Sequence, residues 1–163
     1  MPIKLVIFDM DETLVHARLE PLSQPADLRF GDYFIYIRPY AADLVRFAST
    51  KFSIAVWSTA NPDYVEFIAS ALFGAQYPLL FRWDVQKCVQ KVDSRTNGYV
   101  YVKDLRKVMK HGYQVEEILI VDDSPEKIQR QPRSHLVVEP FHGDRQDQEL
   151  RSVLFNVVPN IFL

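Results

Sequence analysis

The feature that most constrains the fold is a short apolar run that leads directly into two carboxylates. Residues Ile3 to Phe8 are almost continuously apolar, which is typical of a strand covered on both faces. Asp9 and Asp11 follow at once, with no linker between the strand and the charged residues. A strand of this kind belongs in a parallel sheet flanked by helices, with its polar residues at the carboxyl edge.

Two further core-type strands end in the same way. Ser53 to Trp57 leads into Ser58-Thr59, and Ile118 to Val121 leads into Asp122-Asp123-Ser124. Ligands of an open parallel sheet bind beyond the carboxyl ends of its strands, so the three polar clusters are expected to line one crevice. A surface turn could explain any one cluster, because Asp and Ser favour turns, but it explains all three poorly.

The rest of the chain alternates between strand and helix patterns, and it predicts an α/β fold. We expect one domain over 1–163, a three-layer sandwich around a parallel sheet with no large cap domain. Further strands are predicted at Tyr33–Arg38 and His135–Val138, and helices at Tyr40–Thr50, from Asn61-Pro62, at Lys103–Lys110, from Ser124-Pro125 and at Gln146–Val157.

Residues 79–102 show a different pattern and predict a small β insertion outside the sheet. Leu79–Trp83 and Tyr99–Val102 are rich in strand-forming residues, and Asn97-Gly98 is a hairpin turn signal.

Composition narrows the class of protein. The chain is 48% hydrophobic and 25% charged with a net charge of -2, so it offers no basic field to nucleic acid. No stretch approaches the roughly 20 apolar residues of a membrane span. The single cysteine, Cys88, excludes an internal disulfide and fits a reducing compartment. We expect an intracellular, soluble protein without membrane or nucleic-acid partners.

The first polar cluster supplies two carboxylates with separate chemical roles. Asp9 is held by its strand and can act as a covalent nucleophile toward phosphorus. Asp11 lies two residues on and faces the same substrate if the chain stays extended, so its expected role is general acid and then general base. Asp9 and Asp122 would repel each other without a cation, and Mg²⁺ suits them together with the backbone carbonyl of Asp11.

A phosphate also needs donors. The hydroxyls of Ser58 and Thr13 are expected near the nucleophile, and Thr59 follows Ser58 as a further substrate contact. Lys103 would balance the charge of the phosphoryl oxygens in the transition state. Arg38 and Arg82 are predicted to contact a substrate phosphate or an acidic peptide.

The ordered motifs resemble the FCP/SCP phosphatases of the haloacid dehalogenase superfamily. They are Asp9-Met10-Asp11-Glu12-Thr13-Leu14-Val15-His16, Arg38-Pro39, Ser58, Tyr101-Val102-Lys103-Asp104-Leu105 and Asp122-Asp123-Ser124-Pro125. The resemblance implies Asp9 as nucleophile, Asp11 as acid and base, Ser58 and Lys103 on phosphate, and Asp122 on Mg²⁺. Asp123, also a candidate metal ligand, stands where the family often has Asn. The family implies a phosphoserine-containing polypeptide as substrate, selected in part by the hairpin insertion.

Other functions remain to be weighed against a protein phosphatase. A small-molecule phosphatase could use the same scaffold, and some relatives with this fold are non-catalytic binding modules. Retention of both Asp9 and Asp11 favours an enzyme. A calcium loop lacks its Gly, since Leu14 stands there, and Cys88 lacks the arginine of a cysteine phosphatase, since Ser94 stands at that position.

Overall fold

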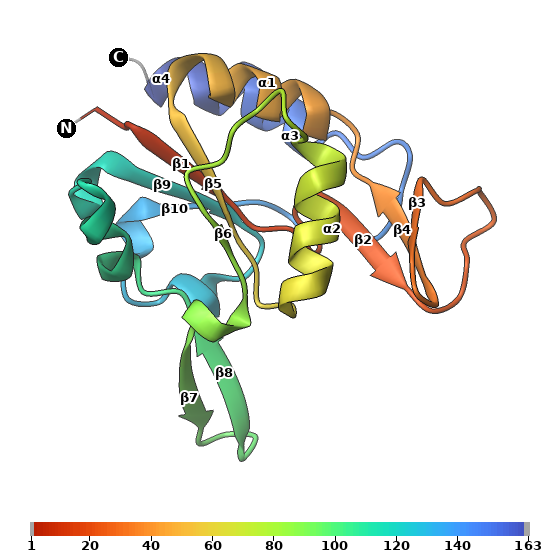
Figure 1. Cartoon of the computed structure of the whole chain (residues 1–163), viewed down its shortest axis with the longest axis horizontal. Helices are drawn as coiled ribbons and strands as arrows, with labels where there is room; N and C mark the ends of the chain where they lie inside the picture. The colour runs from red at the N-terminus through yellow and green to blue at the C-terminus, as the bar shows by residue number, and fades with distance from the viewer. Residues whose placement is uncertain (1, 162–163) are drawn as a thin grey trace.

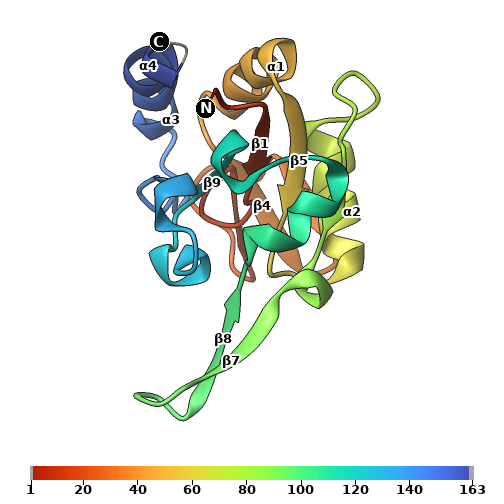
Figure 2. The same ribbon diagram turned by 90° about the vertical axis from the view of Figure 1, so that its left-hand side faces the viewer.

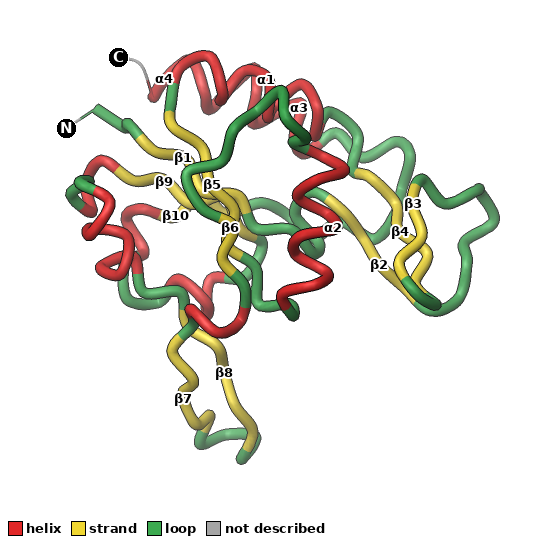
Figure 3. Tube along the Cα trace, viewed as in Figure 1, coloured by secondary structure: helices red, strands yellow, loops and turns green. Residues whose placement is uncertain are grey.

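The computed structural model describes residues 2–161, and a five-stranded parallel sheet lies at its centre (Figure 1; strands are yellow in Figure 3). The strand order is β10-β9-β1-β5-β6. The strands are β1 (Leu5–Phe8), β5 (Ser53–Trp57), β6 (Arg82–Trp83), β9 (Ile118–Asp122) and β10 (His135–Val137). This confirms the predicted α/β fold. Because β5 and β9 both pair with β1, the three polar clusters leave the sheet side by side.

The central strand β1 supplies both faces of the sheet with apolar side chains. Val6 and Phe8 enter one core, whereas Leu5 and Ile7 enter the other. Alternate residues of a strand point to opposite faces, so an apolar run of this kind must be covered twice. All four side chains are 4% exposed or less.

Helices cover each face and complete the three layers. The core of Val6 and Phe8 is closed by α1 (Ala41–Lys51), α2 (Pro62–Leu72) and a C-terminal helix built from α3 (Glu149–Ser152), the π-helical turn η6 (Val153–Val157) and α4 (Val158–Ile161). The core of Leu5 and Ile7 is closed by two 3-10 helices, η2 (Leu105–His111) and η4 (Pro125–Ile128). Three short 3-10 turns complete the helical elements, η1 (Val85–Lys87), η3 (Val115–Glu117) and η5 (Pro132–Ser134).

A second, antiparallel sheet follows the first polar cluster, at the right of Figure 1. Its order is β2-β4-β3, with β2 (Val15–Arg18), β3 (Leu28–Phe30) and β4 (Tyr33–Ile37). The sequence predicted only β4, because the sequence of β2, Val-His-Ala-Arg, carries a weak strand signal. Its pairing with β4 in space makes it a strand.

The hairpin insertion is shorter than predicted and begins later. Its strands are β7 (Val89–Asp93) and β8 (Gly98–Val102), whereas Arg82–Trp83 pairs with β5 at the edge of the main sheet. The segment from Leu79 to Trp83 therefore lies outside the hairpin, which corrects the predicted boundary. Figure 2 shows the hairpin projecting from the layered body. None of the helices within residues 2–161 has the length and apolar character needed to cross a bilayer.

Candidate active site

A tight turn after β1 shapes the first polar cluster. The amide of Asp9 donates to the carbonyl of Val121 at 3.0 Å, which continues the pairing with β9. The chain then reverses over the Met10 carbonyl, which accepts the amide of Leu14 at 2.8 Å. Glu12 takes a left-handed conformation, with φ of 61°, to allow the reversal. Met10 is fully buried and anchors the turn, so Asp9 and Asp11 are held at the carboxyl edge.

Lys103 joins the first and third clusters. Its Nζ lies 2.9 Å from Asp9 Oδ1 and 2.6 Å from Asp122 Oδ2, and the three side chains are almost completely buried. Burial lowers the pKa of Lys103, but the two carboxylates outweigh it and the net pKa is raised, so the ammonium stays charged. A buried charge without a partner is costly, so this ion triad fixes the geometry of the site.

The two carboxylates of the turn have pKa values that move apart. Burial raises the pKa of Asp9, but the charges of Lys103 and Lys127 with hydrogen bonds from Lys103 and Thr13 outweigh it and lower the net value. Burial raises the pKa of Asp11 to about 6, against a hydrogen bond from Tyr64 that lowers it. Asp9 is thus held ionised, while Asp11 can carry a proton near neutral pH.

Tyr64 places the Asp11 side chain. The Tyr64 hydroxyl donates to Asp11 Oδ1 at 2.6 Å. Tyr64 stands in the first turn of α2, where the side chain of Asn61 caps its amide at 2.9 Å and Pro62 occupies the first position. The start of α2 after β5 therefore determines where Asp11 points.

Three carboxylates form a cluster that fits a divalent metal. Oxygens of Asp9, Asp122 and Asp123 lie within 4.8 Å of one another. Burial, followed by the charges of Asp9 and Asp122, raises the pKa of Asp123 to about 7, and burial followed by the charge of Asp9 also raises the pKa of Asp122. Excess negative charge of this kind suits Mg²⁺. The Asp11 carboxylate is not part of this cluster, and its Oδ1 accepts the hydrogen bond from Tyr64.

The predicted hydroxyl donors have different environments. Thr13 Oγ1 donates to Asp9 Oδ2 at 2.9 Å, so it orients the carboxylate. Ser58 Oγ accepts the amide of Ala60 at 3.0 Å, and its hydroxyl hydrogen is bonded to no described residue, so it remains available for a phosphate oxygen. Thr59 Oγ1 accepts from Lys127 Nζ at 3.3 Å.

Arg38 occupies a structural position, which argues against the predicted substrate contact. Its guanidinium is fully buried and bonds both oxygens of Asp147 at 2.8 and 3.1 Å. It also donates to the carbonyls of Glu12, Thr13 and Glu139 at 3.3, 3.2 and 2.7 Å. The side chain therefore ties the turn after β1 to the segment before α3, and its donors are occupied.

Arg82 is likewise bound to the protein. Its Nη1 contacts Glu66 Oε1 at 2.5 Å and Ser70 Oγ at 3.2 Å, both on α2. These partners lie further along α2 than Tyr64, which approaches the site at the beginning of the helix. This geometry does not support the predicted contact with a substrate.

A pocket opens beside Asp11, between the second sheet and α2. Its volume is about 280 Å³, and it is lined by Asp11, Glu12, Ala17, Phe30, Tyr33, Ala60, Asn61 and Tyr64. Aromatic rings from β3, β4 and α2 form its apolar walls. The Asp11 carboxylate and the Tyr64 hydroxyl that binds it therefore lie at the wall of this pocket.

Sequence reasoning missed Tyr64 and Lys127. Tyr64 has a recognisable place, because the cap at Asn61 and the proline put it in the first turn of a helix that begins at the crevice. Lys127 had no such signal, since its approach to Thr59 depends on the path of η4.

The sheet order and the carboxylates at its edge define a protein with a haloacid dehalogenase-like fold. A structure of Fcp1, an essential RNA polymerase II CTD phosphatase, superposes with a TM-score of 0.65 at 18% identity, over 99% of this chain and 48% of that chain. A Bacteroides thetaiotaomicron enzyme of this class, in complex with magnesium and inorganic phosphate, superposes with a TM-score of 0.58 at 13% identity, over 88% of this chain and 98% of that chain. These likenesses establish the fold.

The family follows from the sequence comparison. Residues 4–160 match the family described as NLI interacting factor-like phosphatase, and the chain belongs to that family. It is 28% identical to the human CTD small phosphatase-like protein over 160 residues, which cover 93% of this chain and 54% of the relative. It is 25% identical to a probable C-terminal domain small phosphatase of Dictyostelium discoideum over 159 residues, which cover 93% and 49%. The chain thus spans about half the length of these relatives.

Proposed function

We propose that this chain is a Mg²⁺-dependent phosphatase that hydrolyses phosphomonoesters through an aspartyl-phosphate on Asp9. The observation that carries the proposal is the arrangement around Asp9: its carboxylate lies within 4.8 Å of those of Asp122 and Asp123, while Asp11, two residues on in the same turn, is held apart by Tyr64. The pKa values agree with this arrangement, since that of Asp9 is lowered and that of Asp11 is raised to about 6. A nucleophile must be ionised and a general acid must hold a proton. An ionised Asp9 and a protonated Asp11 meet these two requirements.

The first half-reaction transfers the phosphoryl group to the protein. An oxygen of Asp9 attacks phosphorus, the bond from phosphorus to the ester oxygen breaks, and its electron pair stays on the leaving oxygen. Asp11 gives its proton to that oxygen and the alcohol departs. Lys103 holds Asp9 in place at 2.9 Å, and the free hydroxyl hydrogen of Ser58 can be donated to a phosphoryl oxygen.

The second half-reaction releases phosphate. Asp11, now a carboxylate, takes a proton from water as the water oxygen attacks phosphorus. The bond from phosphorus to Asp9 breaks, which restores the Asp9 carboxylate and frees inorganic phosphate. Asp9, Asp122 and Asp123 would hold Mg²⁺, with the backbone carbonyl of Asp11 as a further expected ligand, and the ion would neutralise charge on the phosphoryl oxygens.

A phosphorylated polypeptide, carrying phosphoserine or phosphothreonine, is the proposed substrate. Two observations support it: the pocket with aromatic walls beside Asp11, and the similarity to a probable C-terminal domain small phosphatase and to the human CTD small phosphatase-like protein. A small phosphometabolite is the rival substrate on the same scaffold. The ratio of kcat/KM for phosphopeptides and phosphometabolites separates the two.

Hydrolysis of para-nitrophenyl phosphate tests the mechanism. With Mg²⁺ at mildly acidic pH, the wild type should turn over, and the activity should be lost in EDTA. Asp9→Asn keeps the shape of the side chain but removes the nucleophile, so its rate should fall by a factor of about 10³ or more. Unchanged thermal unfolding of Asp9→Asn would show that the fold is retained. Activity that survives either treatment would overturn the mechanism.

A further inference from the structure

Lys127 reaches across the mouth of the crevice. It lies in η4, which follows β9, whereas Thr59 follows β5. The strands β9 and β5 are the two neighbours of β1. The hydrogen bond of 3.3 Å from Lys127 Nζ to Thr59 Oγ1 therefore joins the two sides of the crevice over the end of β1, where Asp9 lies.

Lys127 differs from the other cations considered for the site, because it is not committed to a carboxylate. Lys103 is fully buried between Asp9 and Asp122, and Arg38 is bonded to Asp147. The half-buried Lys127 forms no ion pair with any residue in 2–161, and Thr59 accepts the bond that its ammonium donates. A neutral hydroxyl at 3.3 Å is a weak partner for an ammonium compared with an ionised phosphate.

Electrostatics support a position close to the reacting atoms. The charge of Lys127 helps to lower the pKa of Asp9, and its influence is the third largest after burial and the charge of Lys103. It also acts on Asp11 and Asp123, where burial is the largest effect. One ammonium thus acts on all three carboxylates, which agrees with its hydrogen bond to Thr59 at the carboxyl end of β5.

The backbone of Lys127 is fixed by the active-site structure. Its carbonyl accepts the amide of Lys103 at 2.8 Å, and its amide donates to the carbonyl of Ser124 at 3.1 Å. The two lysines are therefore placed by one piece of structure, with the side chain of Lys103 in the interior and that of Lys127 at the mouth.

We propose that Lys127 is a second substrate-binding cation of this site and exchanges its bond to Thr59 for one to an oxygen of the incoming phosphate. The inference rests on the proposed phosphatase function and deepens it. Lys103 orients the nucleophile, while Lys127 meets the dianion as it enters. Covalent bonds do not change in this step.

The test measures competitive inhibition by inorganic phosphate and the KM for para-nitrophenyl phosphate. Lys127→Met should raise both the inhibition constant of phosphate and the KM by about ten- to a hundredfold, the range for loss of a charged hydrogen bond. The change in kcat should be smaller. Lys127→Arg keeps the charge and should recover most of the binding. Lys51→Met removes one charge from the exposed end of α1 and should leave both constants unchanged.

Thr59→Val tests the exchange itself. The variant removes the resting partner of Lys127, so phosphate should inhibit it at least as strongly as the wild type. Weaker inhibition of Thr59→Val would contradict the exchange, because it would make Thr59 the phosphate contact. Thermal unfolding of each variant checks that it is folded.

The outcomes separate this inference from the function on which it rests. A wild type that turns over, with Lys127→Met unchanged in KM and in phosphate inhibition, would overturn the role of Lys127 and leave the phosphatase mechanism standing. A folded wild type that neither turns over nor binds phosphate in Mg²⁺ by calorimetry would overturn both.

Discussion

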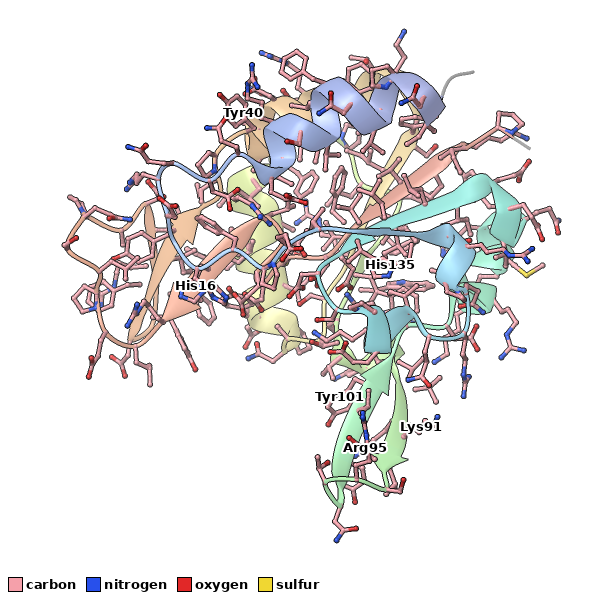
Figure 4. The ribbon with its side chains drawn as sticks, turned by 180° about the vertical axis from the view of Figure 1, so that it is seen from behind. His16, Tyr40, Lys91, Arg95, Tyr101 and His135 are labelled. Carbon is pink, nitrogen blue, oxygen red and sulfur yellow. The ribbon has the colours of Figure 1, made fainter. Side chains whose placement is uncertain are left out.

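The crevice and the β7–β8 hairpin adjoin in the chain but differ in almost every physical respect. Val102 ends β8 and the next residue is Lys103, which is fully buried. In the hairpin, Val92 and Tyr99 are 64% and 65% exposed and form a cross-strand pair. Figure 4 shows Lys91, Arg95 and Tyr101 along the hairpin, away from His135 in the sheet. The crevice buries charged side chains that have several partners, whereas the hairpin exposes apolar side chains to water.

This contrast implies that substitutions in the crevice and on the hairpin should have different effects. Changes in the crevice leave buried charges without partners, so they should affect folding and chemistry together. Changes on the hairpin face alter surface that has few contacts, so they should affect neither. Three variants test this difference, beginning with the largest expected effect.

Lys103→Met should have the largest effect. It leaves Asp9 and Asp122 buried without their cation, which should lower the free energy of unfolding by about 3–5 kcal/mol in EDTA. Added Mg²⁺ should recover part of the loss, since a divalent ion replaces the missing charge. The rate should fall by about 100-fold or more, as for loss of a charged group at a phosphoryl site. Urea unfolding with and without Mg²⁺ measures the first two effects, and a stability equal to the wild type would refute the contrast.

Asp104→Asn should have an intermediate effect that depends on pH. Hydrogen bonds from Arg106, and then from Arg130 and Gln131, outweigh the effect of burial and lower the pKa of Asp104. A carboxyl whose folded pKa is lowered stabilises the fold above its unfolded pKa of about 3.9, and the contribution is lost as pH falls below that value. The variant should lose about 1–3 kcal/mol at pH 7.

Unfolding of Asp104→Asn across pH checks the sign of the effect. The gap between wild type and variant should close as pH falls from about 4 toward the lowered folded pKa. A gap of constant size from pH 7 to the acid end would show that the charge of Asp104 is not the cause.

Tyr99→Ser should have the smallest effect. Loss of one exposed cross-strand pair should cost less than about 1 kcal/mol. Hydrolysis of para-nitrophenyl phosphate should be unchanged, because the ring is largely exposed and lies on the hairpin. A fall of tenfold or more in that rate would show that the hairpin and the crevice are coupled, and the comparison would have to be abandoned.

The same contrast explains how much the sequence could predict. Strong local patterns identified β1, β5, β9 and the polar residues that follow them, because buried parallel strands carry continuous apolar runs. The parallel pairing then brings Asp9, Ser58 and Asp122 to one edge. These parts of the fold follow from few and robust rules.

The parts that escaped prediction depend on contacts between distant segments. The strands β2 and β3 are defined by pairing with β4, and the first predicted strand of the hairpin became the sheet edge β6. Arg38 carries the same charge as a phosphate-binding arginine, and nothing in its neighbourhood along the chain announces Asp147 as its partner. The roles of Tyr64 and Lys127 likewise arise from the paths of α2 and η4.

The bond between Arg38 and Asp147 has a consequence for the order in which the molecule can be completed. Arg38 holds the carbonyls of Glu12 and Thr13, yet its own anchor lies 109 residues further along the chain. A ribosome makes the turn after β1 well before it makes Asp147, at about 5–20 residues per second. The turn after β1 is therefore complete in the chain for most of the time of synthesis before the partner of Arg38 exists. The support that Arg38 gives to this turn can form only after Asp147 has been made.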